Sequence, residues 1–273
     1  MRLGRIGYVN CYPVYGAIDR GLVAAPATLV TGTPAELNDR LADGRLDVSV
    51  ISAVAYAQRA EEYELLPDLA ISSDGPVRSV LLFSRRPPEG LGGARVLVST
   101  ASRTSVQLLE LLARDRWGVA FAAESAPAER ADLARLAAIP HDAVLVIGDG
   151  ALLLSAARAY PYVMDLGEEW KAWTGLPFVF AVWAARRAVD RQAVRDVHRA
   201  LLASRKWGLQ HLDDLAEGAA AATGVERERC REYLAGLDYG LSYRHLAGLA
   251  DFLRRLAARG VVPDGTLSFL GAA

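Results

Sequence analysis

Short apolar runs alternate with amphipathic segments along the first 185 residues of the chain. The runs are typical of buried strands, whereas apolar positions three or four residues apart are typical of helices. Regular alternation of the two predicts parallel strands joined by helical crossovers. In the first part of the chain, strands are expected at 6–9, 27–31, 46–51, 70–73 and 77–84, with helices at 13–20, 34–43 and up to 59.

One helix start in this part has a recognisable mechanism. Thr33 can cap the helix, Pro34 suits its first turn, and Glu36 can complete a capping box with Thr33. Gly44 then ends the helix.

A second unit follows a linker rich in proline and glycine at residues 85–93. An apolar run at 176–184 can lead the chain back to the first unit, and the pattern from Asp190 onward is helical. Within the second unit, strands are expected at 95–99, 119–122, 143–147 and 162–165, with helices at 104–116, 131–137 and 150–159.

This order predicts two α/β lobes, the second inserted into the first, with a central cleft between them and two crossing segments. The first lobe comprises residues 1–86 together with 177–273, which include the helical tail. The second lobe comprises residues 87–176.

Composition removes several function classes. Thirty-one Lys and Arg balance 32 Asp and Glu, giving a net charge of −1, so no bulk attraction to nucleic acid or to an anionic membrane is expected. No apolar run is long enough to span a bilayer. The chain opens directly on its first strand with no export signal, which favours a cytoplasmic location. Two distant cysteines and four scattered histidines give no metal-ligand cluster.

Polar residues at predicted strand ends are the first candidates for chemistry. Asn10 follows the opening apolar run, at the edge where open α/β sheets hold ligands. Ser102, Thr104 and Ser105 open a helix, and their hydroxyls with the free N–H groups can receive a carboxylate or phosphate. Plain capping by Ser102 or Thr104 is the alternative reading.

Further candidates stand at other turns. Gly148 and Asp149 follow the strand at 143–147, where Asp149 can orient a ligand or simply cap the next helix. Ser52 lies at the same sheet edge as Asn10 and is also a candidate cap. Arg78 can pair with an anion or remain a solvated surface residue, and Ser79 follows it.

The usual catalytic and nucleotide-binding motifs are missing: the sequence has no G-x-S-x-G, P-loop, G-x-G-x-x-G or H-E-x-x-H. None of the four histidines falls at the strand-end turns, so a histidine base is poorly supported.

Several blocks, in this order, resemble the chorismate dehydratase family of the futalosine route to menaquinone. They are GRIGYVNCYPVY, TPAELNDRLADGRLDVSVISAVAY, LLPDLAISSDGPVRSVLLFS, STASRTSVQLLELL, LVIGDGALL and DLGEEWKAWTGLPFVFAVWA. Together they cover about residues 3 to 186, and the set is far more specific than any one block.

The resemblance implies a type II periplasmic-binding-protein fold and a lyase that removes water from chorismate, giving 3-(1-carboxyvinyloxy)benzoate. It implies no cofactor and no metal. Asn10 becomes the leading catalytic candidate, orienting the leaving hydroxyl because an amide is no strong base. The proton acceptor is either a carboxylate of the substrate or Asp149, whose pKa a closed cleft would raise.

Other readings stay open. A related family of the same fold makes 1,4-dihydroxy-6-naphthoate. The fold also serves small-anion receptors, here a cytosolic one, and effector domains of transcription factors, although no DNA-binding segment precedes residue 4. Sequence gives no oligomeric state.

Overall fold

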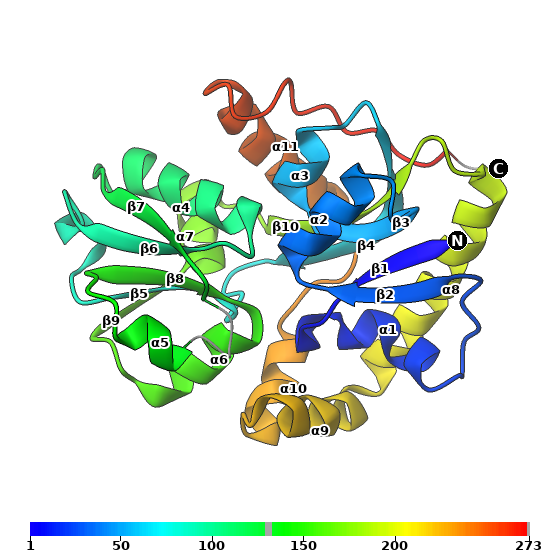
Figure 1. The fold of residues 1–273 in the computed structure, drawn as a ribbon, viewed down its shortest axis with the longest axis horizontal. Coiled ribbons are helices and arrows are strands. Elements are labelled where there is room, and N and C mark those ends of the chain that lie inside the picture. The colour runs from blue at the N-terminus through cyan, green and yellow to red at the C-terminus, as the bar shows by residue number, and fades with distance from the viewer. Residues whose placement is uncertain (129–132, 272–273) are drawn as a thin grey trace.

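The computed structural model describes residues 1–128 and 133–271. They form two lobes side by side, each built on one five-stranded sheet with helices around it (Figure 1). The first lobe has the sheet order β2-β1-β3-β10-β4. Its elements are β1 (Arg2–Ile6), η1 (Val9–Cys11), α1 (Tyr12–Asp19), β2 (Thr28–Gly32), α2 (Pro34–Ala42), β3 (Val48–Ser52), α3 (Ala53–Ala57), β4 (Tyr63–Ser73) and β10 (Phe178–Arg186).

The second lobe has the sheet order β7-β6-β8-β5-β9. Of its predicted helix at 131–137, residues 131 and 132 lie outside the described residues. Its elements are β5 (Val80–Ser84), η2 (Pro88–Gly90), β6 (Arg95–Ser99), α4 (Arg103–Asp115), β7 (Ala122–Ala126), α5 (Leu133–Ala137), β8 (Ala143–Ile147), α6 (Gly148–Ala157), β9 (Tyr162–Asp165) and α7 (Leu166–Thr174).

Both sheets share one topology. In the first sheet, β10 is inserted between β3 and β4, after the order β2-β1-β3. In the second sheet, β5 is inserted in the same way between β8 and β9, after the order β7-β6-β8. These inserted strands, β5 and β10, run antiparallel to both neighbours, whereas β1, β2 and β3 are parallel, as are β6, β7 and β8. The predicted parallel strands are present, but each sheet is mixed, because a strand that arrives by crossing between lobes needs no helical return.

One lobe boundary also differs from the prediction. Strand Val80–Ser84 pairs with β8 and β9 and so belongs to the second sheet, although the boundary at 86/87 assigned it to the first lobe. The Pro/Gly-rich stretch that suggested that boundary is the β5–β6 connection within the second lobe. The first crossing is instead residues 74–79, and the second is residues 175–177.

The opening strand begins earlier than its apolar run. β1 covers Arg2–Ile6, and Val9 already belongs to the turn η1. Arg2 pairs with Asp47 and Arg5 pairs with Asp19, so charged side chains within the strand hid it from the hydrophobic pattern. The expected strand at 119–122 likewise lies later, as β7.

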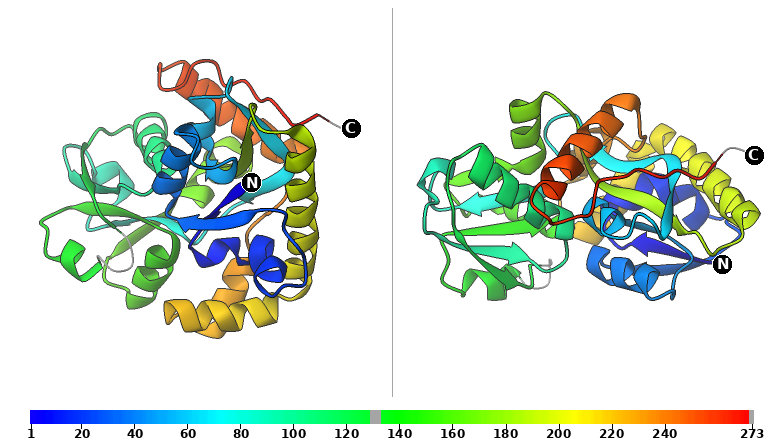
Figure 2. Two further views of the ribbon diagram at one scale, coloured as in Figure 1. Left: turned by 45° about the vertical axis from the view of Figure 1, so that its right-hand side comes forward. Right: turned by 90° about the horizontal axis from the view of Figure 1, so that it is seen from above.

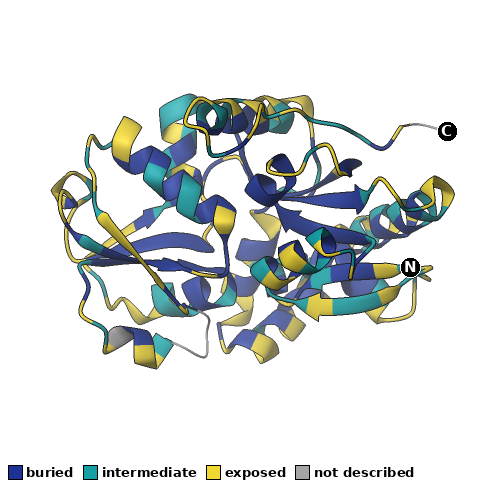
Figure 3. Ribbon diagram, turned by 45° about the horizontal axis from the view of Figure 1, so that its top comes forward, coloured by how far each residue is buried: buried dark blue, intermediate teal, exposed yellow. Residues whose placement is uncertain are grey.

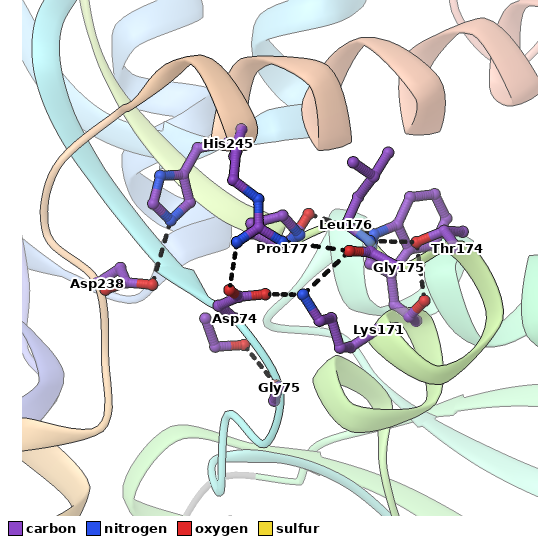
Figure 4. Close-up of polar contacts among 12 residues, drawn as sticks. Asp74, Gly75, Lys171, Thr174, Gly175, Leu176, Pro177, Asp238 and His245 are labelled. Carbon is purple, nitrogen blue, oxygen red and sulfur yellow. Dashed lines mark hydrogen bonds and ion pairs between the residues drawn. The ribbon is translucent and has the colours of Figure 1, made fainter.

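The two crossings are tied together by polar contacts (Figure 4). Asp74 in the first crossing forms ion pairs with Lys171 of α7 and with Arg244. Lys171 Nζ also donates to the carbonyl of Gly175 in the second crossing, over 3.0 Å. Trp170 Nε1 donates to the carbonyl of Pro177, over 3.2 Å. These bonds fix the relative orientation of the lobes at the hinge.

The C-terminal part of the chain is helical, as predicted, and covers the first lobe (Figure 2). Helix α8 packs on α1, while α9 and α10 pack on each other beside the gap between the lobes. None of the helices in the described part of the chain is long and apolar enough to cross a membrane. The four helices are α8 (Arg191–Gln210), α9 (Leu212–Thr223), α10 (Arg227–Ala235) and α11 (Tyr243–Ala257).

The sheets carry the core, and their strands are mostly buried (Figure 3). β10 is buried along almost its whole length, and Trp183 Nε1 donates to the hydroxyl of Tyr15 over 3.0 Å. Tyr15 in turn donates to the carbonyl of Gly4. This chain of bonds fixes α1, and with it the Asn10 turn, against the first sheet.

Candidate active site

A pocket lies between the lobes, at the strand ends where the sequence places the candidate residues. It holds about 520 Å³ of space free of protein atoms, part of which is open to solvent. The first lobe contributes Ile6, Tyr8, Asn10, Pro34, Ser52, Ile71, Phe180 and Ala181. The first crossing and the second lobe contribute Val77, Ser79, Val80, Ser102, Ser105, Ile147 and Gly148.

Asn10 reaches the pocket because the turn η1 separates β1 from α1 and presents its side chain at the sheet edge. Its Oδ1 atom is buried and has no hydrogen-bond partner among the described residues. An unsatisfied buried acceptor costs free energy, about 1–3 kcal/mol, unless a ligand supplies the donor. Asn10 is therefore built to receive a ligand hydrogen bond.

Ser102 and Ser105 bring the hydroxyl-rich start of α4 into the pocket. Ser102 Oγ accepts from the backbone N–H of Ser105 at 3.1 Å and donates to Ser105 Oγ at 2.8 Å. Capping and pocket lining, the two readings open for Ser102, are thus combined in one residue. Because Ser105 Oγ accepts from Ser102, its own hydrogen remains available to a ligand.

Ser52 serves in the same two ways. Its Oγ accepts from the N–H of Ala55 at 3.2 Å and so caps α3, and it lines the pocket. Asn38 of α2 accepts from the Ser52 N–H at 3.1 Å and holds the turn in place. The predicted capping box of α2 is present between Thr33 and Glu36.

Gly148, at the start of α6, lines the pocket on the side of the second lobe. Its φ is +60°, and a Cβ there would lie 2.7 Å from the ring of Tyr8. Glycine is required for both reasons, since only it adopts this conformation freely and leaves room for the ring. Tyr8 thus closes over the start of α6.

Three predicted residues do not line the pocket. Thr104 Oγ1 accepts from the backbone N–H of Val54 at 3.0 Å, and Asp149 Oδ1 accepts from that of Val9 at 3.1 Å. Both bonds join one lobe to the other. The helical turn explains the outcome: adjacent residues point about 100° apart, so Ser105 and Gly148 line the pocket while Thr104 and Asp149 contact the opposite lobe.

Arg78 lies on the other side of the crossing. It borders a second pocket, whose atom-free space of about 690 Å³ includes open solvent, together with Arg229 and Tyr233. Its backbone has φ +59°, and its N–H donates to Asp165 Oδ2 at 2.6 Å. Burial raises the pKa of Asp165, while its bonds from four backbone N–H groups oppose that rise.

The pocket has an uncharged lining: among its described residues, only Tyr8 has an ionisable side chain. Positive potential comes instead from the N-termini of α2, α4 and α6, represented at the pocket by Pro34, Ser105 and Gly148. Neighbouring Cys11 is a free thiol, and burial raises its pKa to about 12, so it is no nucleophile at neutral pH. This chemistry suits a small organic anion with polar and apolar faces.

Sequence reasoning missed the second layer of the site. Tyr233 of α10 is fully buried, and its hydroxyl donates to Ser79 Oγ at 2.8 Å. Nothing in the helical pattern of the tail distinguishes this tyrosine from a core residue. Among the described residues, no group of three or more His, Cys, Asp and Glu is placed to hold a metal.

Two α/β lobes with this shared strand order, and a pocket between them lined by apolar side chains and a few hydroxyl and amide groups, define a periplasmic-binding-protein-like fold. The fold matches the alkanesulfonate-binding protein of Xanthomonas axonopodis pv. citri with a TM-score of 0.72 and 15% identity, over 98% of this chain and 95% of that one. Protein AF1704 of Archaeoglobus fulgidus matches with a TM-score of 0.79 and 21% identity, over 96% and 98%.

Within this class, the chain belongs to the menaquinone biosynthesis family, whose model matches residues 1–258. A chorismate dehydratase of Thermus thermophilus is 35% identical over 238 residues, which are 82% of this chain and 84% of the relative. A 1,4-dihydroxy-6-naphtoate synthase of the same organism is 28% identical over 224 residues, 78% and 76% of the two chains. The family expected from the sequence blocks is thereby confirmed.

Proposed function

We propose that the protein is a chorismate dehydratase, a hydro-lyase that forms 3-(1-carboxyvinyloxy)benzoate and water from chorismate. Of the two Thermus thermophilus relatives, the dehydratase is more identical to this chain than the naphthoate synthase, at 35% against 28%. The observation that carries the proposal at the site is the buried Asn10 Oδ1 without a partner, because chorismate brings a ring hydroxyl that can donate to it. Such a biosynthetic role accords with a cytoplasmic location.

The reaction breaks two bonds on neighbouring ring carbons. The C–O bond to the ring hydroxyl breaks, the proton on the ether-bearing carbon leaves, and the two electrons of that C–H bond complete the aromatic ring. Hydroxide and proton depart together as water, so the step needs no oxidant or reductant. Aromatisation supplies much of the driving force, and the protein's task is chiefly orientation.

The binding roles follow from the pocket lining. The carboxylates are received by hydroxyls and backbone N–H groups, with Ser102 and Ser105 at one end and Ser79 at the other. Asn10 holds the leaving hydroxyl in the elimination geometry. Ser52 and Gly148 line the pocket beside these groups.

A carboxylate of the substrate is the proposed proton acceptor. Asp149 is the protein alternative, but its carboxylate is engaged by the N–H of Val9 and lies outside the pocket lining. Since the described lining offers only Tyr8 as an ionisable group, the substrate's own carboxylate is the base left to take the ring proton.

Incubation with chorismate tests the proposal. We expect the diene absorbance to fall while an aromatic product lighter by one water accumulates. Asn10→Ala should lower kcat by about 100-fold, the size of effect seen when a positioned polar group is removed. Asn10→Asp keeps the shape but adds negative charge, so it should chiefly raise KM.

Several outcomes would contradict it. Binding of chorismate without turnover would support a small-anion receptor instead, and turnover of a naphthoate precursor in place of chorismate would support the sister activity. Asn10→Ala turning over at the wild-type rate would remove Asn10 from the mechanism.

A further inference from the structure

Tyr233 connects the helical tail to the pocket. It lies in α10, which packs on α9, and α9 packs on α1, so the helix belongs to the first lobe. Its hydroxyl reaches Ser79, which stands at the end of the first crossing, immediately before β5 of the second lobe. The bond therefore spans the two lobes, behind a pocket-lining side chain.

The direction of hydrogen bonding matters here. The hydroxyl of Tyr233 donates to Ser79 Oγ at 2.8 Å, so Ser79 must use its own single hydrogen elsewhere. Within the protein, Ser79 Oγ donates it to the carbonyl of Val77 over an oxygen–oxygen distance of 3.4 Å, well beyond the usual value of about 2.7–2.8 Å for such bonds. A ligand oxygen in the pocket can take it over at little cost.

We propose that Tyr233 is a positioning residue that turns Ser79 into a hydrogen-bond donor toward the substrate. By filling the acceptor side of Ser79, it aims the serine hydrogen at an oxygen of the bound anion. Chained hydroxyls also polarise one another, which strengthens the terminal donor. The inference rests on the proposed function, because it assigns Ser79 to a carboxylate of chorismate.

The surroundings hold Tyr233 in this state. Burial raises its pKa, so the phenol keeps its proton at all ordinary pH values. The end of α10 lies close against the crossing, since a Cβ at Gly236 would come within 2.2 Å of Arg78 Nη1. Tyr233 itself is fully buried in a helix that packs on α9, so its ring has little room to move.

A double-mutant cycle on chorismate turnover tests the inference. Tyr233→Phe, which deletes one oxygen, should raise KM about five- to tenfold with little change in kcat. Ser79→Ala should have the larger effect on KM. In the Ser79→Ala background, Tyr233→Phe should change KM less than about twofold, because its target is gone.

Tyr239 provides the matched control. It is another fully buried tyrosine of the tail, and its hydroxyl has no partner among the described residues. Tyr239→Phe should leave KM unchanged. Melting temperatures of all variants report folding, and the conservative deletions keep every ring in place.

The outcomes separate the two claims. A wild-type protein that does not dehydrate chorismate overturns the proposed function, and the role of Tyr233 in it as well. If the wild type is active, two results would overturn the positioning role alone. One is that the effects of Ser79→Ala and Tyr233→Phe on KM multiply in the double variant. The other is that Tyr239→Phe raises KM as much as Tyr233→Phe.

Discussion

At the scale of single residues, Gly148 shows how closely the pocket wall is fitted. It combines a left-handed φ of +60° with a Tyr8 ring that would stand 2.7 Å from any Cβ. The two constraints are independent, because one belongs to the backbone and the other to a side chain from the opposite lobe.

Gly148→Ala should therefore both destabilise the protein and impair turnover. The left-handed conformation alone costs about 1–2 kcal/mol for a residue with a Cβ, and displacement of Tyr8 adds to it and changes the pocket. Gly118 has φ +67° with no atom within 4 Å of a Cβ. Gly118→Ala should lower the melting temperature only through the strained backbone and leave KM unchanged. Equal KM values for the two variants would contradict a role of the Gly148–Tyr8 contact in the pocket.

Sequence reasoning could predict pocket residues that stand at strand ends, and it did so for Asn10, Ser52 and Gly148. It could not decide between adjacent residues of one helix turn, since the angle at which a helix meets the other lobe is a tertiary property. Thr104 therefore faces Val54 and not the pocket. Tyr233 was beyond reach, because 154 residues separate it from Ser79.

At the scale of elements, two helix starts meet across the lobes. Thr104, in the first turn of α4, accepts the N–H of Val54 in the first turn of α3. Both residues are buried, so the acceptor satisfies a donor that would otherwise be unpaired when the lobes are together.

Replacing this acceptor should weaken the contact between the lobes. Thr104→Val keeps the shape but leaves the Val54 N–H unsatisfied, at a cost of about 1–3 kcal/mol. We expect a higher KM for chorismate and a lower melting temperature. Thr104→Ser retains the oxygen and should behave like the wild type; a loss in Thr104→Ser as large as in Thr104→Val would show that the methyl group, not the hydrogen bond, matters.

Elements were predictable where hydrophobic runs are uninterrupted. The strands at 95–99, 143–147 and 162–165 have the predicted bounds. β4 begins at Tyr63, well before the strand expected at 70–73. Its first part was not predicted because Pro67 and Asp68 interrupt the apolar pattern, although the strand continues through them. Strand direction was not predictable, since it depends on which lobe the chain has just left.

At the scale of the whole molecule, Asp74 is the charged centre of the hinge. Its carboxylate faces Lys171 and Arg244 as ion-pair partners, with His245 near enough to add to their field. The hydrogen bond from Lys171 is the main reason that the pKa of Asp74 lies below its ordinary value of 3.8, and it outweighs the effect of burial.

The contribution of Asp74 to stability should consequently decrease as the pH falls. A carboxyl group with a lowered native pKa stabilises the fold above its unfolded pKa, and this stabilisation is lost as pH falls through the native pKa. The melting-temperature difference between wild type and Asp74→Asn should be largest near neutral pH and shrink below pH 3.8.

The size of this difference should be modest, about 1 kcal/mol or less, because the pair is partly solvent-exposed. Asp196→Asn removes an ion pair with Arg199 within a single helix, α8, and provides the control for a pair that joins no lobes. If the Asp74 ion pairs act at the hinge, Asp74→Asn should raise KM for chorismate, whereas Asp196→Asn should leave KM unchanged. A melting-temperature difference that stays constant down to pH 3 would contradict the role of the Asp74 carboxylate.

Because β10 lies between β3 and β4, the first sheet cannot be completed until the second lobe has been synthesised. All strands of the second lobe lie between residues 80 and 165, so that lobe can be complete while Phe178 has still to leave the ribosome. Until then β3 and β4 present bare, apolar edges, which are templates for wrong pairing. The nascent chain is therefore most exposed to aggregation at residues 48–73, and it is there that a chaperone would be needed during translation.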